Sequence, residues 1–214
     1  MAILYSATVI VIGLWMSADV ALQPQIDRPH GALVVDINGT GHRLTSIGEG
    51  VEFDLNADRI LDRVSWIPRG SDLAFLVADW NQNGRIDSGF ELIGVGSGPS
   101  DGFKELAAND GIAPGADSQR IADRTPDGVI DARDLLYQQM RLWKDLNHNG
   151  ISEEDELESL PHAGVIAIEL NEMPLDIPDV HGNLLRSELR IVVQKGAGST
   201  STRTMAKVQL QVRR

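Results

Sequence analysis

The chain has 214 residues, of which 42% are hydrophobic, and its formal net charge is −12. This length permits one sizeable buried core, so we expect one domain or one domain with a small appendage. The acidic balance argues against a nucleic-acid partner, which would need a basic surface, and the absence of cysteine excludes disulfides, thiolate catalysis and cysteine-based metal sites.

The N-terminal segment is apolar. Residues 1–16 read MAILYSATVIVIGLWM, which suits the hydrophobic part of a signal peptide better than a membrane span of roughly 20 residues. We therefore expect residues 1–22 to be a signal peptide and the protein to be secreted or periplasmic. Because no Lys or Arg precedes the run, an uncleaved N-terminal membrane anchor is the alternative. Residues 23–30 contain two prolines and are typical of a linker.

The folded part begins with short β-type runs, each bounded by turn residues. They cover residues 31–36, 50–54, 64–67 and 73–77. A further strand is predicted at 165–170, and residues 184–194 and 205–212 favour a hairpin around a Gly-rich turn.

Between these strands the sequence predicts a helical unit. Leu136, Met140 and Trp143 fall at helical spacing, which favours a helix over residues 131–144. A second helix is predicted over 153–160, ending at Pro161. The predicted fold class is therefore α+β, with short β-strands and hairpins around a central EF-hand-like helix-loop-helix unit. Residues 31–175 would form this calcium-binding domain, and residues 176–214 would pack on it as a C-terminal β-hairpin.

Three acidic loops rich in Asn and Gly carry most of the functional information. Each has oxygen-bearing side chains at positions 1, 3 and 5 and glycine at position 6, and this spacing surrounds one point with the oxygen ligands that Ca²⁺ requires. The last loop fits this template best. Its predicted ligands are Asp145, Asn147, Asn149, the Ile151 carbonyl and the carboxylate of Glu156 at position 12.

The other two loops differ from this template in the position or type of their last carboxylate. The middle loop has Asp rather than Glu at position 12, and its predicted ligands are Asp123, Thr125, Asp127, the Val129 carbonyl, Asp131 and Asp134. The first loop has its glutamate one residue late, and its predicted ligands are Asp79, Asn81, Asn83, the Arg85 carbonyl, Asp87 and Glu91.

A metal-free interpretation competes with this one, because Asp, Asn and Gly favour turns without any cation. Two weaker relatives begin at Asp36 and Asp54, and the second has Arg59 where glycine is expected. For these two, turns without metal are the preferred interpretation, and their metal binding is left open.

The ordered series of motifs resembles a known family. The matching stretches include VVDINGTG, EFDLNADRILDRVSWI, GSDLAFLVADWNQNGRIDSGFELIG and PDGVIDARDLLYQQMRLWKDLNHNGISEEDEL. From about Gly31 to Val212 the chain resembles bacterial exported EF-hand-like calcium-binding proteins, similar to the calcium-binding and self-processing modules associated with RTX proteins. The resemblance implies calcium binding through the three loops, and it implies that the late Glu91 belongs to the first site.

We therefore expect an exported, non-catalytic protein whose loops bind Ca²⁺ and stabilise the fold. One alternative is a calcium-dependent adhesion or dockerin-like module with an unidentified protein or cell-surface partner. The other is a self-processing module, which in some relatives cleaves an Asp-Pro bond just upstream. The chain contains no Asp-Pro dipeptide, so self-cleavage is disfavoured.

Overall fold

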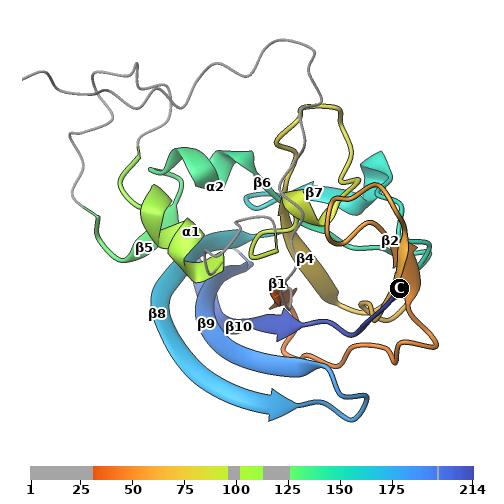
Figure 1. The fold of residues 1–214 in the computed structure, drawn as a ribbon. Coiled ribbons are helices and arrows are strands. Elements are labelled where there is room, and N and C mark those ends of the chain that lie inside the picture. Colours follow the sequence, from red (N-terminus) through yellow and green to blue (C-terminus); the bar gives the residue numbers. More distant parts are fainter. Residues whose placement is uncertain (1–30, 96–101, 113–125, 197) are drawn as a thin grey trace, which may run out of the picture.

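The structure is a computed structural model that describes residues 31–95, 102–112, 126–196 and 198–214. Within these residues the protein is mostly β, with two short α-helices (Figure 1). The predicted signal peptide and linker, residues 1–22 and 23–30, lie outside the described residues. In the part that is described, no helix is long and apolar enough to cross a membrane.

Two antiparallel sheets make up the described strands. The larger has eight strands in the order β5-β8-β9-β10-β1-β4-β6-β7, and the smaller has three in the order β11-β3-β2. The strands of the larger sheet are β1 Gly31–Asp36, β4 Leu73–Ala78, β5 Val129–Asp131, β6 Met140–Trp143, β7 Leu157–Ser159, β8 Val165–Pro178, β9 Leu184–Lys195 and β10 Ser199–Gln209. Those of the smaller sheet are β2 Val51–Phe53, β3 Asp62–Val64 and β11 Val212–Arg213.

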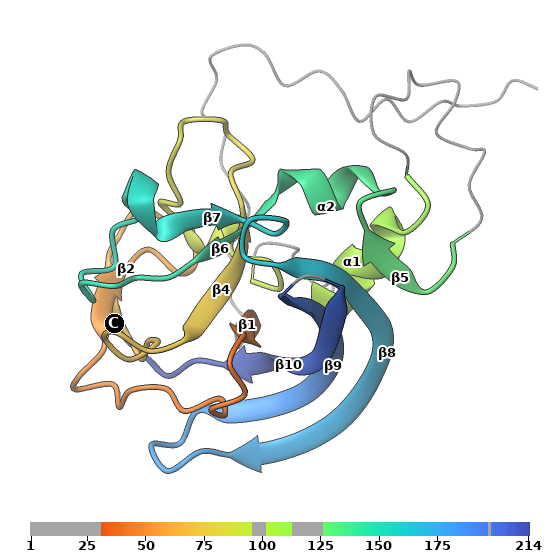
Figure 2. The same cartoon turned by 180° about the vertical axis from the view of Figure 1, so that it is seen from behind.

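The larger sheet is curled. Strands β8, β9 and β10 sweep round in a broad arc, which is seen from opposite sides in Figures 1 and 2. The pairing of β8 with β9 shifts register at three places along β8. Such irregularities add an unpaired residue and bend a strand, so they account for the curvature of this long pair.

The central strands of the larger sheet, β1 and β4, are buried on both faces. Along β4, side chains alternate between two core clusters: Phe75 and Val77 belong to one, and Leu76 and Ala78 belong to the other. The small sheet contributes Phe53 to the first cluster. The other face is covered by helices α1 Gly102–Asn109 and α2 Leu135–Gln139.

The predicted α+β fold with a central helix-loop-helix unit is wrong. Helix α2 has only five residues, and the chain then continues as β6, which pairs with β4. The predicted second helix is a 3-10 turn at Glu154–Glu156, followed by β7. The reason is burial on both faces: Leu142 packs in one cluster and Trp143 in the other. A strand buried on both sides has a continuous apolar run, which sequence spacing does not distinguish from a helix.

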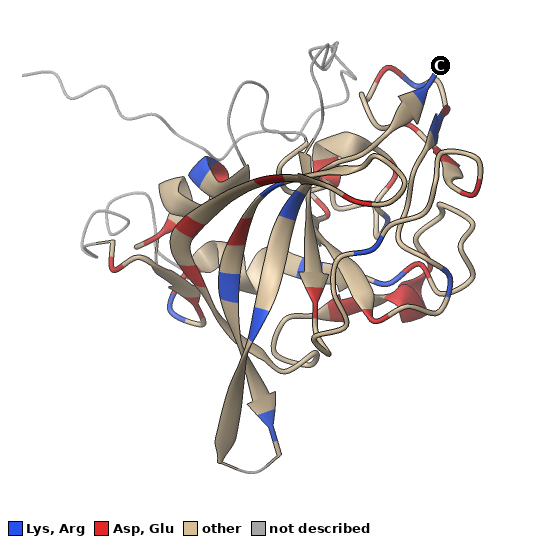
Figure 3. Cartoon of the chain, turned by 90° about the horizontal axis from the view of Figure 1, so that it is seen from below, with Lys and Arg blue, Asp and Glu red and all other residues tan. Residues whose placement is uncertain are grey.

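Charges of opposite sign are neighbours on the curved strands. Bands of Lys and Arg lie beside bands of Asp and Glu on this surface (Figure 3). In the register of β8 and β9, Glu169 is opposite Arg190, and such cross-strand pairs are stabilising. At this position a basic residue of β9 therefore faces an acidic residue of β8.

The aromatic cluster beneath β6 leads to a first testable prediction. Trp143 is fully buried and its ring lies 5.4 Å from that of Trp66 and 5.8 Å from that of Phe53. We expect Trp143→Ala to lower the free energy of unfolding by about 3–5 kcal/mol. Urea denaturation measures this, with Gln139→Ala at an exposed site as a control expected to stay within about 0.5 kcal/mol of the parent. Equal effects of the two changes would contradict the buried strand.

Candidate functional site

Four loops fold into the same turn. Counting the first aspartate as position 1, its carboxylate accepts hydrogen bonds from the backbone N–H groups of positions 5 and 6. The nitrogen–oxygen distances lie between 2.6 and 3.1 Å. The four aspartates are Asp36, Asp54, Asp79 and Asp145. These hydrogen bonds curl each loop around the carboxylate of its first aspartate.

Positions 4 and 6 of each loop have positive φ. In the Asp145 loop they are His148 (φ 63°) and Gly150 (φ 72°). In the Asp54 loop they are Ala57 (φ 59°) and Arg59 (φ 69°), although residues with a side chain rarely adopt this conformation. The loop beginning at Asp54 therefore has the shared geometry despite lacking the glycine that the template requires.

In the Asp79 loop, hydrogen bonds link three of the predicted ligands. The side-chain amide of Asn83 lies 2.7 Å from a carboxylate oxygen of Asp87, and the Asp87 N–H donates to Oε2 of Glu91 at 3.0 Å. Glu91 lies in a 3-10 helix, Gly89–Glu91, that folds the late carboxylate back against the loop. The late position of the glutamate is thus accommodated.

Glu91 is the most unusual group in this site. It is 1% exposed, and among the described residues its Oε1 has no hydrogen-bond partner. Burial raises the pKa of the Glu91 carboxyl to about 7, and the nearby carboxylates of Asp87 and Asp79 act in the same direction. A buried, unpaired oxygen that faces other carboxylates is a position where a cation would relieve an electrostatic cost.

The Asp145 loop is closed by Glu156 at position 12. Oε1 of Glu156 accepts the N–H groups of Leu146 and Asn147 at 2.8 and 3.4 Å. Burial raises the pKa of Glu156, and a hydrogen bond with Glu153 acts in the same direction. At position 9, Oε1 of Glu153 accepts the side-chain amides of Asn147 and Asn149. Glu153 therefore links the side chains of positions 3 and 5, and Glu156 holds the backbone of positions 2 and 3.

Two tryptophans connect this loop to the core. The indole N–H of Trp66 donates to Oδ2 of Asp145 at 2.8 Å, and that of Trp143 donates to Oε2 of Glu156 at 3.3 Å. His148 extends the connection, because its Nδ1 lies 2.9 Å from the Ile67 carbonyl oxygen. Positions 1 and 12 of the loop are therefore held by indoles that are themselves packed in the aromatic cluster.

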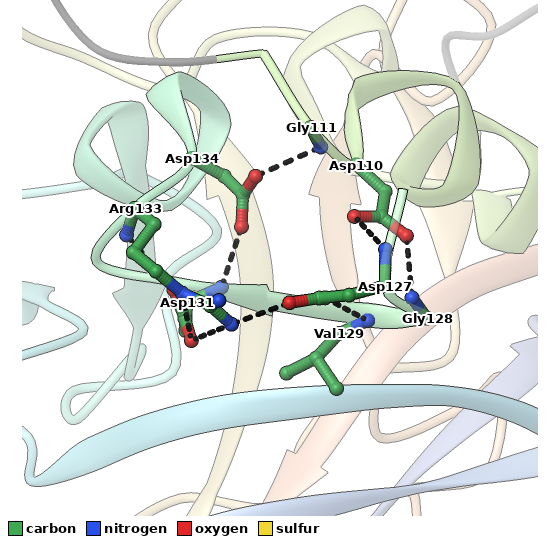
Figure 4. Close-up of polar contacts among 8 residues, drawn as sticks. All are labelled: Asp110, Gly111, Asp127, Gly128, Val129, Asp131, Arg133 and Asp134. Atoms are coloured by element: carbon green, nitrogen blue, oxygen red, sulfur yellow. Dashed lines mark hydrogen bonds and ion pairs between the residues drawn. The ribbon is translucent and has the colours of Figure 1, made fainter. Parts of the chain in front are cut away.

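The middle loop is assembled from two separate segments (Figure 4). Asp110 accepts the N–H groups of Asp127 and Gly128 at 3.2 and 2.7 Å, as a position-1 aspartate does in the other loops. Asp134 accepts the N–H groups of Gly111 and Asp131, both at 2.9 Å. Asp110 thus makes the backbone contacts that a position-1 aspartate makes in the other loops. The predicted ligands Asp123 and Thr125 lie outside the described residues.

An arginine lies in the same loop. The Arg133 guanidinium bridges the carboxylates of Asp127 and Asp131 at 2.6 and 2.7 Å, as Figure 4 shows. These carboxylates are positions 5 and 9 of the loop. A cation in this loop would have to share them with Arg133 or displace it, so the arrangement favours weaker binding here than in the Asp79 and Asp145 loops.

Two acidic residues were missed by the sequence reasoning. Glu153 is position 9 of the loop in which Asp145 is position 1, so the template could have indicated it. Asp110 could not be found in this way, because a long segment separates it from Asp127. In the described part of the chain, no three His, Cys, Asp or Glu side chains form a cluster able to hold a metal ion. The loops instead combine carboxylates with Asn and carbonyl oxygens, a donor set that fits a hard cation.

Comparisons with known proteins give a family. A family model described as the SPM domain matches residues 33–211. The iron-regulated protein FrpA of Neisseria meningitidis serogroup C is 31% identical over 178 residues, which is 82% of this chain and 14% of the relative. The chain thus spans about a seventh of the length of that curated relative.

The resemblance to EF-hand-like calcium-binding proteins is therefore wrong as a family assignment, because the matching model is the SPM domain and neither an EF-hand nor a calcium-binding family. The similarity to FrpA is consistent with the expected association with RTX proteins. The absence of the predicted helix-loop-helix unit agrees with this correction.

The split loop makes a second prediction. Asp110→Asn removes the charged acceptor of the Asp127 and Gly128 amides, and bonds to charged groups are the stronger ones. We expect these two amides to exchange with deuterium at least about tenfold faster, a change that corresponds to about 1.4 kcal/mol. Asp72→Asn, at an exposed position outside the loops, is the matched control and should leave both rates unchanged. Unchanged exchange in Asp110→Asn would show that Asp110 does not hold these two amides.

Proposed function

We propose that this protein, which belongs to the SPM domain family, binds Ca²⁺ through the Asp79–Glu91 and Asp145–Glu156 loops and is stabilised by it. The loop that combines Asp110 with residues 127–134 is proposed as a weaker site. The proposal takes the protein to be non-catalytic and exported, in the periplasm or outside the cell. Extracellular calcium modules bind with Kd of roughly 10⁻⁴ to 10⁻³ M, so we expect weak sites here.

One observation carries the proposal: the buried, unpaired Oε1 of Glu91 beside the Asp79 loop. A buried carboxylate oxygen without a donor is costly. The negative charges of Asp87 and Asp79 also raise the pKa of Glu91, so the loop carries electrostatic repulsion among these carboxylates. A divalent cation would replace the missing donor and neutralise the repulsion at the same time.

The chemistry of the donors favours Ca²⁺ over softer metals. The proposed ligands are carboxylate, amide and backbone carbonyl oxygens, and the chain has no cysteine. Hard oxygen donors in flexible loops suit Ca²⁺, whereas thiolate and imidazole donors suit zinc or copper. In the Asp79 loop the ligands would be Asp79, Asn81, Asn83, the Arg85 carbonyl, Asp87 and Glu91.

Calcium should stabilise the folded chain. A ligand that binds only the folded state raises the free energy of unfolding by about 2.7 kcal/mol at a hundredfold excess over Kd. We expect Asp79→Asn to remove most of the part that the first site contributes, because the charge at position 1 is lost while the side chain keeps its size. Urea denaturation in calcium and in a chelator gives the two values.

Asp72→Asn is the matched control for this experiment, since Asp72 is an exposed aspartate outside the loops. It should keep the full response to calcium. If the parent protein is equally stable in saturating calcium and in chelator, the proposed function is incorrect.

The pKa of Glu91 predicts a pH dependence in the calcium-free protein. Its folded-state pKa of about 7 lies above the ordinary value of 4.5, so between these values the folded state holds a proton that the unfolded state has lost. The unfolding free energy should therefore fall as pH rises from about 4.5 to about 7, by at most about 3 kcal/mol. Glu91→Gln cannot ionise and should reduce this fall.

The measurement is urea denaturation across that pH range in the presence of chelator. Glu154→Gln, at an exposed position of the other loop, serves as the control and should retain the fall. Parallel pH profiles for the parent and Glu91→Gln would show that Glu91 does not titrate as expected.

A further inference from the structure

The Asp79 and Asp145 loops touch at equivalent positions. Ser152 is position 8 of the Asp145 loop, and Ile86 is position 8 of the Asp79 loop. The Ile86 N–H donates to the Ser152 hydroxyl oxygen at 2.7 Å, and the same hydroxyl lies 3.3 Å from the Ile86 carbonyl oxygen, to which it donates. One side chain thus satisfies both backbone groups of Ile86.

This contact lies away from solvent. Ser152 is 4% exposed and Ile86 is 2% exposed. Buried backbone groups are almost always paired, so the hydroxyl cannot leave without a cost to Ile86. The contact is therefore a buried hydrogen-bonded link between the two loops and not an exposed, easily broken one.

Each contact residue lies between two proposed ligands of its own loop. Ile86 is flanked by Arg85, which offers its carbonyl, and by Asp87 at position 9. On the other side, Ser152 is flanked by Ile151, which offers its carbonyl, and by Glu153 at position 9. Ordering the ligands of one loop consequently restricts the residue that contacts the other loop.

We propose that cation binding at the Asp79 and Asp145 sites is positively coupled through the Ser152 hydroxyl. This inference rests on the proposed function. A cation in the first loop fixes Arg85 and Asp87, and hence Ile86 between them. The Ser152 hydroxyl is then held, so the second loop loses less conformational freedom when its own ligands close around a cation. Linkage requires that the second site affects the first by the same factor.

The test is a calcium titration of the full chain followed by NMR of backbone amides. The Gly84 and Gly150 N–H groups donate to Asp79 and Asp145 respectively, so each amide reports one loop. In Asp79→Asn we expect the calcium concentration that half-saturates the Gly150 response to rise at least about fivefold, within the usual range of coupling. In a Ser152→Ala background, adding Asp79→Asn should no longer change that midpoint.

Ser152→Thr keeps the hydroxyl and should keep the coupling. Should Ser152→Ala fail to fold, Glu156→Gln supplies the reciprocal measurement: the Gly84 midpoint must rise by the factor seen for Gly150 in Asp79→Asn. An unchanged Gly150 midpoint in Asp79→Asn would overturn the coupling while both loops still bind calcium. If neither amide responds to calcium in the parent, the proposed function itself fails, and the coupling with it.

Discussion

The Asp145 carboxylate joins the candidate site to the hydrophobic core. It accepts two backbone N–H groups of its own loop and the indole N–H of Trp66. Trp66 in turn packs against Phe75 of β4 with ring centroids 4.5 Å apart. The Asp145 carboxylate is therefore fully engaged as a hydrogen-bond acceptor between its own loop and the core. Contacts with the core therefore help to fix the conformation of this loop. A change in the loop conformation would in turn alter the packing of the aromatic cluster.

The shape of the Asp79 and Asp145 loops could be predicted from the sequence because their proposed ligands are nearly contiguous. A spacing of alternate residues followed by glycine specifies a turn with few conformational alternatives. The buried state of Glu91 could not be predicted. It depends on a 3-10 helix packed under the loop, and packing of this kind arises from tertiary contacts rather than local preference.

The strands were predicted where the pattern was local, as in Gly31–Asp36 and Leu73–Ala78. Prediction failed at Met140–Trp143, where a strand buried on both faces has apolar residues at helical spacing. Nor did the sequence indicate the contacts of Asp110, because they join two segments that are far apart in the chain. Both cases depend on contacts between segments that are far apart in the chain. Local periodicity and motif spacing carry no information about such contacts.

The Asp54 loop shows that the turn can form without the glycine that the calcium-binding template requires. Ala57 and Arg59 adopt positive φ there, at a cost of about 1–3 kcal/mol each. The neighbouring loop restrains this one: the Gly89 N–H donates to the Asp54 carbonyl at 2.8 Å, and a Cβ at Gly89 would lie 1.8 Å from the Leu55 carbonyl oxygen. Such packing and the Asp54 hydrogen bonds hold this turn in its conformation although it lacks the template glycine. The fold thus sets the backbone shape of these turns, so we expect a bound cation to act by neutralising the carboxylates and by ordering the ligands that close around it.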